Sequence, residues 1–206
     1  HTRYFGDWSS DVCSSDLREA AHGWVDLLTP VIKATCSDVG FACTVQALQC
    51  FGGYGYIGEY PAEQYVRDAK IASIYEGTNG IQAIDLLGRK LLRDGGAGMS
   101  DLIDEIEASL SEFEAAGDAL GAMPANLRHG VAALRRATEW LLDPGNNDLE
   151  RKFAGAVPFL NLTGTVVGGW LMARAGIAAQ ARLAGANGDS RFLESKLATA
   201  RFYADH

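Results

Sequence analysis

Residues 49–92 decide the fold of this chain and read QCFGGYGYIGEYPAEQYVRDAKIASIYEGTNGIQAIDLLGRKLL. Two glycine-rich turns, at residues 52–58 and 77–80, flank a short segment that opens with Pro61. Glu76 lies in the second turn, just ahead of a predicted helix that Thr78 is placed to cap. Spacing predicts that the inward face of this helix consists of Ile81, Ile84, Leu87 and Leu91.

A long helix is predicted upstream of the first glycine turn. Thr29 and Pro30 form a typical helix start, with a hydroxyl N-cap and proline at the first helical position. Gly52-Gly53 is expected to end this helix, and residues 18–28 to close a preceding one. Its apolar stripe, at three- and four-residue steps, consists of Ile32, Cys36, Val39, Cys43, Ala47 and Cys50.

The region after residue 95 predicts a helical bundle. Gly95-Gly96-Ala97-Gly98 indicates a linker, where we place a domain boundary. Four helical segments follow: one capped by Ser100, one over 126–142, one over 149–184 kinked near Pro158, and a last one after residue 190. Short loops between such helices favour an antiparallel four-helix bundle, so we predict an all-α chain. The expected core residues are Ile103, Ile106, Leu110, Phe113, Leu120, Leu127, Val131, Leu134, Leu141, Phe192, Leu193, Leu197 and Ala200.

Composition and charge exclude several classes of protein. The chain has 206 residues, 48% hydrophobic and 21% charged, which is typical of a globular protein. Its formal net charge of −8 argues against binding to a phosphate backbone. Residues 95–206 hold ten Lys/Arg against fourteen Asp/Glu, so no basic arm is hidden in the total. We expect no nucleic-acid partner.

The cysteines indicate a reducing compartment. Cys36, Cys43 and Cys50 share one helix face, with neighbours roughly 10 Å apart along the axis, which is too far for a disulfide. We interpret them as small buried hydrophobic residues of a cytoplasmic protein. Neither they nor Cys13 combine with a histidine at metal-ligand spacing, so no metal site is expected.

The N-terminal segment, residues 1–17, shows no helical or strand periodicity and no signal-peptide core. Its run DWSSDVCSSDL resembles the translated read-through of a sequencing adapter, and the chain lacks an initiator Met. We therefore expect residues 1–17 to be a foreign leader and the rest to be the C-terminal part of a longer protein. A native disordered tail is the alternative.

A 21-residue uncharged run, from Phe153 to Ala173, is long enough to span a bilayer. It also contains Pro158 and four glycines, of which Gly164 and Gly168 have the spacing of a membrane packing motif. We favour a central bundle helix whose glycines permit close backbone approach, and we expect no membrane span.

The two glycine turns carry a family resemblance. Gln49-x-x-Gly52-Gly53 and the Tyr75-to-Thr78 turn resemble the C-terminal catalytic region of flavin-dependent acyl-CoA dehydrogenases over residues 18–92 (18–94 as a domain). Residues 95–206 resemble the extra helical domain of a longer subgroup. The resemblance implies that Glu76 removes the α-proton of an acyl-CoA thioester while a β-hydride passes to flavin N5. A carboxylate made more basic by desolvation suits that role, whereas spacing alone favours a mere charge at a helix dipole.

The same resemblance implies the contacts of the substrate and of FAD. Tyr75 and Gly77 would line the acyl pocket, and the Glu76 N–H with a flavin ribityl hydroxyl would polarise the thioester carbonyl. Gln49 and the backbone of Gly52-Gly53 would contact the FAD of a neighbouring subunit. Thr78 and Asn79 would face the FAD of the same subunit. Gly80 stands where the family often has Gln or Glu, so no contact is expected from that position.

Residues 53–58 also satisfy the pattern G-x-G-x-x-G. A dinucleotide-binding fingerprint needs a strand before it and a helix directly after it. Here a helix is predicted before it and Pro61 follows, so we reject that reading and keep a helix end and turn as the structural alternative.

The implied partners are an acyl-CoA substrate, an electron-transfer flavoprotein or similar acceptor, and other copies of the chain in a homo-oligomer. Two alternatives stay open: a non-catalytic helical module for oligomer assembly, and a DNA-associated flavoprotein of the same fold. We expect the 206 residues alone to bind FAD weakly and to be inactive.

Overall fold

The computed structural model describes residues 15–185 and 188–205, with side chains from residue 22 onward, and within these ranges it contains helices and no strand. The predicted all-α class is therefore confirmed. Residues 1–14 of the expected leader, with Cys13, lie outside the described ranges. The elements are α1 (Ser15–Phe51), α2 (Gly53–Tyr56), α3 (Ala62–Ile71), α4 (Asn79–Asp85), a π-helix η1 (Leu86–Leu92), α5 (Ala97–Ala115), a 3₁₀ turn η2 (Gly117–Ala119), α6 (Met123–Leu142), α7 (Leu149–Ala154), α8 (Ala156–Ala184) and α9 (Ser190–Asp205).

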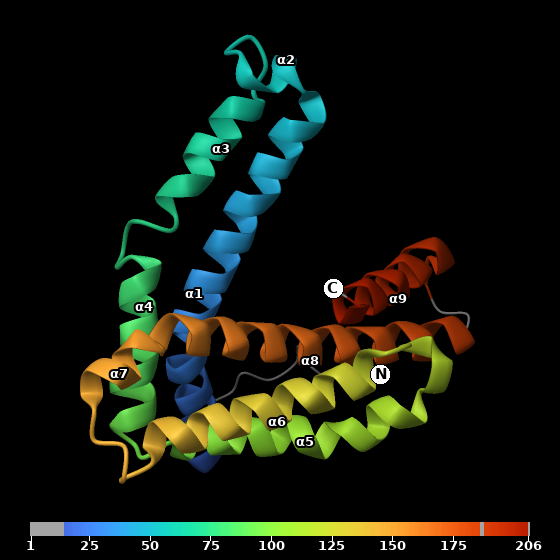
Figure 1. The fold of residues 1–206 in the computed structure, drawn as a ribbon. Coiled ribbons are helices and arrows are strands. Elements are labelled where there is room, and N and C mark those ends of the chain that lie inside the picture. The colour runs from blue at the N-terminus through green and yellow to red at the C-terminus, as the bar shows by residue number, and fades with distance from the viewer. Residues whose placement is uncertain (1–14, 186–187, 206) are drawn as a thin grey trace.

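The first four helices form an elongated arm on one side of a helical bundle (Figure 1). α1 runs without interruption through Pro30, so the helix start predicted at Thr29-Pro30 is wrong. The Thr29 hydroxyl does not cap a helix; it donates to the Val25 carbonyl one turn back, at 2.5 Å. Leu27 and Val31, on either side of the proline, are both buried in the core. Its predicted end at Gly52-Gly53 is confirmed, because α1 stops at Phe51.

The buried face of α1 differs from the predicted one. Ile32 and Val39 are each 56% exposed, and Cys36, Cys43 and Cys50 are exposed, so the prediction that this stripe and its cysteines are buried is wrong. The residues that reach the core are Leu27, Val31 and Ala34, because that side of the helix meets the bundle. We call the opposite side, formed by Ile32, Cys36, Val39, Cys43, Ala47 and Cys50, the exposed seam of α1.

The helix after the second glycine turn also changes its buried face. Leu87 and Leu91 are buried as predicted, whereas Ile81 and Ile84 are about half exposed and are not inward. η1 follows α4 directly, and the wider π turn rotates the later side chains relative to an α-helix. Ile81 and Ile84 both precede η1, and the face of this segment that meets the core is formed instead by Ala83, Leu86 and Leu87.

Helices α5, α6, α8 and α9 pack together as the predicted bundle (Figure 1). Most of the expected core residues are buried: Ile103, Ile106, Leu110, Phe113, Leu120, Leu127, Val131, Leu134, Leu141, Leu193 and Ala200. Phe192 is an error, since it is 56% exposed. α5 begins at Ala97 rather than at a Ser100 cap, because the Asp94 carboxylate accepts the N–H groups of Gly96 and Gly98.

The long apolar segment breaks at Gly155 instead of Pro158, which lies in the first turn of α8 where proline is tolerated. α8 is the one described helix long and apolar enough to cross a membrane, and 56% of its most apolar window is buried here. Its glycines permit close approach as predicted: a Cβ on Gly164 would collide with Thr35 of α1, and one on Gly168 with Tyr203 of α9.

One core joins the arm to the bundle. Buried residues from α1 and η1 belong to the same hydrophobic cluster as those of α5, α6 and α8. The rings of Trp24 and Trp170 lie 6.0 Å apart between α1 and α8, and the Trp170 Nε1–H donates to the Ser109 hydroxyl of α5 at 3.0 Å. The chain passes from η1 to α5 at residues 93–96, and both helices contribute to this shared core. The domain boundary predicted at residues 95–98 stays a prediction.

Candidate active site

The turn that carries Glu76 connects α3 to α4. It is closed by backbone hydrogen bonds, from Tyr75 N–H to the Ile71 carbonyl (3.0 Å) and from Asn79 N–H to the Ser73 carbonyl (3.3 Å). Thr78 is the N-cap of α4, as predicted, and its hydroxyl accepts the Ile81 N–H at 3.3 Å. The turn is therefore anchored at both ends by short-range bonds.

Glu76 has an unusual backbone. Its φ is 54°, and among the described residues it is the only non-glycine with positive φ. Gly77 follows with φ 83°. A non-glycine residue in the left-handed region costs about 1–3 kcal/mol and persists only when its surroundings hold it there. Such strain is concentrated at functional sites, so it marks Glu76 independently of any motif.

Lys33 of α1 is the main support of this turn and was missed in the sequence. Its ammonium donates to the Gly77 carbonyl at 2.7 Å and to the Asn79 Oδ1 at 2.8 Å. The Gln82 amide, also missed, donates to the Glu76 carbonyl at 3.1 Å. These bonds hold the carbonyls of the two residues with positive φ. The sequence places Lys33 on a polar face of α1 with Asp26, Thr29 and Ser37, but that pattern does not identify the acceptor.

Asn79 connects α4 to α1. Its Nδ2 donates to the Asp38 carboxylate (2.7 Å), the Ser37 hydroxyl (2.9 Å) and the Ala34 carbonyl (3.3 Å). With Lys33 on its Oδ1, the whole side-chain amide is used within the chain. The residue predicted to face FAD thus has a clear structural role, and its backbone N–H is also used, by the Ser73 carbonyl, so a flavin contact of Asn79 stays a prediction.

The side chains of Tyr75 and Glu76 point to solvent. Both residues are exposed, and among the described residues no hydrogen bond or ion pair engages the Glu76 carboxylate. The Glu76 N–H likewise has no acceptor in the described part of the chain. A carboxylate and a backbone donor of one residue are therefore both available to the same ligand. This arrangement can accept a proton and polarise a carbonyl.

The other predicted cofactor residues lie at the far tip of the arm (Figure 1). Gln49 lies in the last turn of α1, and Gly52 precedes α2 with φ 60° and ψ −142°, which favours glycine. Gln49, Gly52 and Gly53 are exposed, and a Cβ on either glycine would meet no atom within 4 Å. The ten residues of α3, roughly 15 Å of helix, separate this tip from Glu76. Within one chain the two groups do not come together.

The pattern at residues 53–58 has the wrong context for a dinucleotide fingerprint, as the sequence predicted. α1 precedes it instead of a strand, and only the four-residue α2 lies within it. In the described ranges, no group of three or more His, Cys, Asp or Glu side chains is arranged to hold a metal ion.

Comparisons with known proteins cover nearly all of the described chain. Residues 15–92 match the family described as acyl-CoA dehydrogenase, C-terminal domain, and residues 102–206 match acetyl-CoA dehydrogenase C-terminal like. A 3-methylmercaptopropionyl-CoA dehydrogenase of Ruegeria pomeroyi is 39% identical over 92% of this chain and 32% of its own length. A broad-specificity linear acyl-CoA dehydrogenase of Mycobacterium tuberculosis is 38% identical over 87% of this chain and 30% of its own length.

A butyryl-CoA dehydrogenase of Syntrophomonas wolfei is 32% identical over 98% of this chain. The chain spans about a third of the length of these curated relatives. Both family matches and the extent of the alignments lead to one assignment: the chain belongs to the acyl-CoA dehydrogenase family.

Proposed function

We propose that this chain forms part of an enzyme that dehydrogenates an acyl-CoA thioester between its α and β carbons, with Glu76 as the base that removes the α-proton. Membership of the family supports acyl-CoA dehydrogenation in general. Because the chain spans only a third of its relatives, the activity of the whole protein is part of the proposal.

The strained backbone of Glu76 is the observation that carries it. A glutamate that merely complemented a helix dipole would need no positive φ, because a carboxylate on a relaxed backbone serves equally well. Here the chain uses Lys33, Gln82 and the Thr78 cap to hold the turn. These three contacts fix the backbone of Glu76, which supports a role that depends on the position of its carboxylate.

The proton transfer needs a free carboxylate beside the substrate's α-carbon. Glu76 has no competing partner in the described chain, and a bound acyl group would displace the water around it. The free Glu76 N–H is suited to hydrogen-bond the thioester oxygen and to stabilise charge that develops there. Tyr75 and Gly77, on either side, would border the acyl group.

The cofactor would be FAD, which the family uses and which, when bound, accepts the β-hydride. The residues present fit parts of such a group. At Gly52 and Gly53 the backbone faces open space, so a phosphate can approach it closely. At the start of α4 the Asn79 N–H is used by the Ser73 carbonyl, so Thr78 would supply the donor to an acceptor atom of the cofactor. Electron-transfer flavoprotein is the proposed acceptor of the electrons.

A chimera tests the base. This chain would replace the matched segment of the Ruegeria pomeroyi relative, and acyl-CoA-dependent reduction of an artificial electron acceptor would be measured. Glu76→Gln is expected to lower kcat roughly 10²–10⁴-fold, the usual contribution of a general base. Glu59→Gln, an exposed glutamate of the other turn, is the matched control and should leave turnover unchanged. Equal turnover of Glu76→Gln and the parent chimera would defeat the assignment.

Oligomer assembly without catalysis is the second candidate, and the exposed seam of α1 favours it. Ile32 and Val39 are each 56% exposed on the same helix face, and apolar surface gathered on one face marks sites of protein–protein contact. Val39→Asp would place a charge in that seam, and it should dissociate an assembled oligomer in sedimentation velocity. If assembly were the only role, this variant would lose the oligomer while Glu76→Gln changed no property of the protein.

A further inference from the structure

The backbone hydrogen bonds of the Glu76 turn lie at its two ends and leave its middle unsupported. Glu76 and Gly77 have φ values of 54° and 83°, the signs that a type I′ turn needs at its two central residues. Such a turn is often closed by a backbone bond from its fourth residue to its first, here from Thr78 to Tyr75. The described backbone does not form that bond. The two left-handed residues are therefore held by groups outside the turn.

Two side chains supply this support. The Gln82 amide, in the first turn of α4, donates to the Glu76 carbonyl at 3.1 Å. The Lys33 ammonium, from α1, donates to the Gly77 carbonyl at 2.7 Å. A hydrogen bond from an ionised donor is about twice as strong as a neutral one, so Lys33 makes the stronger contact. Each of the two left-handed residues thus has its carbonyl fixed by a side chain.

Lys33 is used for these contacts alone. Its side chain is partly buried, and within the described chain it forms no ion pair. Its two acceptors are neutral oxygens, the Gly77 carbonyl and, at 2.8 Å, the Asn79 Oδ1. The Asn79 Nδ2 in turn donates to the Asp38 carboxylate at 2.7 Å. Lys33, Asn79 and Asp38 therefore form a chain of polar contacts in which both charges come from α1 and which fixes the start of α4.

The position of this backbone decides where the chemistry of Glu76 can occur. Relaxation of the Glu76 φ would move its carboxylate and its free N–H together, because both belong to the same strained residue. Reacting atoms must lie about 3–3.5 Å apart, and a displacement of about 1 Å can lower a rate roughly 10²-fold. A loss that acts on the transition state lowers kcat and leaves KM nearly unchanged.

We infer that Lys33 is a positioning residue for the removal of the α-proton, with Gln82 as its weaker partner. Lys33 acts through the backbone of the turn: it holds the Gly77 carbonyl, 44 positions away in the sequence, and so keeps Glu76 in its left-handed conformation. The inference rests on the proposed role of Glu76 as the base and adds to it a residue from a different helix.

Steady-state kinetics of the chimera with the Ruegeria pomeroyi relative tests the inference. Lys33→Met has a side chain of comparable length without the donor, and its kcat should fall roughly 10–10²-fold with KM within about twofold of the parent value. Lys33→Arg keeps a positively charged donor and should recover most of that loss. Gln82→Met removes the neutral donor and should lower kcat less, by roughly threefold to tenfold.

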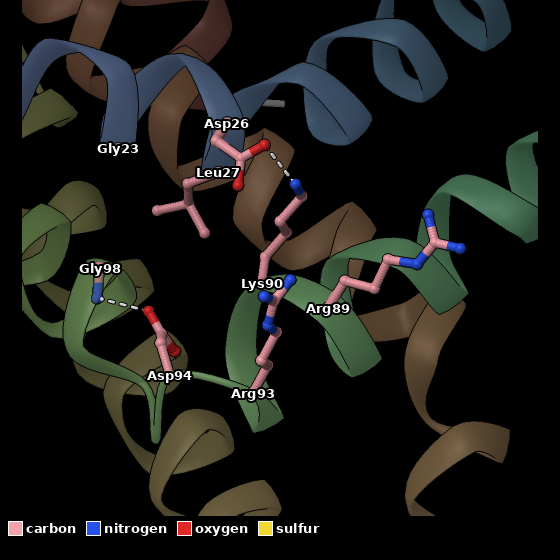
Figure 2. A pocket seen from close by; sticks show the side chains of 8 residues that line it. All are labelled: Gly23, Asp26, Leu27, Arg89, Lys90, Arg93, Asp94 and Gly98. Carbon is pink, nitrogen blue, oxygen red and sulfur yellow. Dashed lines mark hydrogen bonds and ion pairs between the residues drawn. The ribbon is translucent and has the colours of Figure 1, made fainter. Parts of the chain in front are cut away.

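Lys90→Met is the matched control. Lys90 also joins α1 to the segment formed by α4 and η1, through its ion pair with Asp26, and its side chain is only 16% exposed. Figure 2 shows this pair, which lies near the other end of that segment from the Glu76 turn. Lys90→Met should lower the melting temperature and leave kcat within about twofold of the parent value. An equal fall of kcat in both lysine variants would mean that general loosening of α1 is responsible, and would overturn the inference.

Hydrogen exchange of the full chain gives a readout that does not depend on catalysis. The N–H groups of Tyr75 and Asn79, which bond to backbone carbonyls at the two ends of the turn, should lose protection in Lys33→Met. They should keep it in Lys90→Met. Equal protection in both variants would contradict the support that Lys33 is inferred to give.

The failure of this inference is distinguishable from failure of the proposed function. Parent-like turnover of Glu76→Gln would defeat the proposed function. A slow Glu76→Gln together with a Lys33→Met as fast as the parent would defeat only the positioning role. If Lys33→Met did not fold, the partly exposed Gln82 would provide the test, and unchanged kcat in Gln82→Met would overturn the inference.

Discussion

The arm and the bundle treat apolar residues in opposite ways. In the bundle of α5, α6, α8 and α9, large side chains such as Phe113 and Leu134 are at most 1% exposed. In the part of the arm that lies away from the bundle, α1 beyond residue 35 with α2 and α3, the side chains of Val39, Phe51 and Tyr65 are each more than half exposed. The bundle buries its apolar side chains within the chain, whereas the arm presents apolar surface that the described residues leave uncovered. The arm, with the turns that join its helices, also contains every residue predicted to act in catalysis or in cofactor binding.

The largest effect is expected when one apolar side chain is truncated in each region. Phe113→Ala removes a fully buried ring and should lower the free energy of unfolding by about 3–5 kcal/mol. Val39→Ala, in the exposed seam of α1, should change it by less than about 0.5 kcal/mol. Urea denaturation followed by tryptophan fluorescence measures both. A cost above about 1.5 kcal/mol for Val39→Ala would mean that the seam is covered in solution.

The joint between the two regions can be tested at Gly164. Gly164→Ala places a methyl group against Thr35 Oγ1 and should cost about 1–3 kcal/mol of stability, as overpacked sites do. Thr35→Ala removes the colliding hydroxyl, which is buried without a hydrogen-bond partner. The double variant should therefore recover most of the loss, a coupling that thermal denaturation of all four proteins measures.

Gly40 provides the control for that cycle. It is also a helical glycine of α1, and a Cβ there would meet no atom within 4 Å. Gly40→Ala should stabilise the chain by about 0.5–1 kcal/mol. If Gly164→Ala behaved in the same way, the arm and bundle would not be in close contact at this point.

The bundle was predictable from sequence because its helices bury their apolar stripes within the chain. Periodicity identified Ile103, Phe113 and Leu134 correctly, since a stripe on an amphipathic helix faces whatever core the chain itself supplies. The same reasoning failed on α1, where two apolar faces compete. Leu27 and Val31 are buried while Ile32 and Val39 are exposed, and periodicity cannot decide which face meets the core.

The candidate site was predictable only in part. Thr78 as a helix cap follows from local rules, and the structure agrees. The support from Lys33 comes from a residue 44 positions away, so it depends on how α1 and α4 pack. The π-helix also escaped prediction, because a wider turn leaves no local signature in the residue types. Catalytic, substrate and cofactor roles at residues 49–53 and 75–79 stay predictions.

Substitution of Asn79 and of Asn126 compares a polar contact of the arm with a polar contact of the bundle. Asn79→Ala removes the amide that links α4 to α1 and should lower the free energy of unfolding by about 1–2 kcal/mol. The bond to Asp38 contributes little of this, because it is exposed to water. Asn126→Ala removes one bond to the Ala204 carbonyl in the bundle and should cost less than about 1 kcal/mol. In hydrogen exchange, residues 78–85 should lose protection in the first variant only. Equal exchange in both would show that packing alone holds the Glu76 turn.

Tyr203 gives the smallest effect and probes the edge of the bundle. Its hydroxyl donates to the Thr165 carbonyl of α8 at 3.0 Å, and burial raises the pKa of the Tyr203 phenol above its ordinary value of 10.0. The folded state therefore favours the neutral phenol, and its stabilising contribution is complete below pH 10 and lost as the pH rises through the folded value. Thermal unfolding between pH 8.5 and 11 should show a steeper fall in Tm for the parent chain than for Tyr203→Phe. If Tm fell equally with pH in the parent and in Tyr203→Phe, the phenol would be exposed to water in solution. The packing of α9 against α8 would then be looser than the packing of α5 against α6.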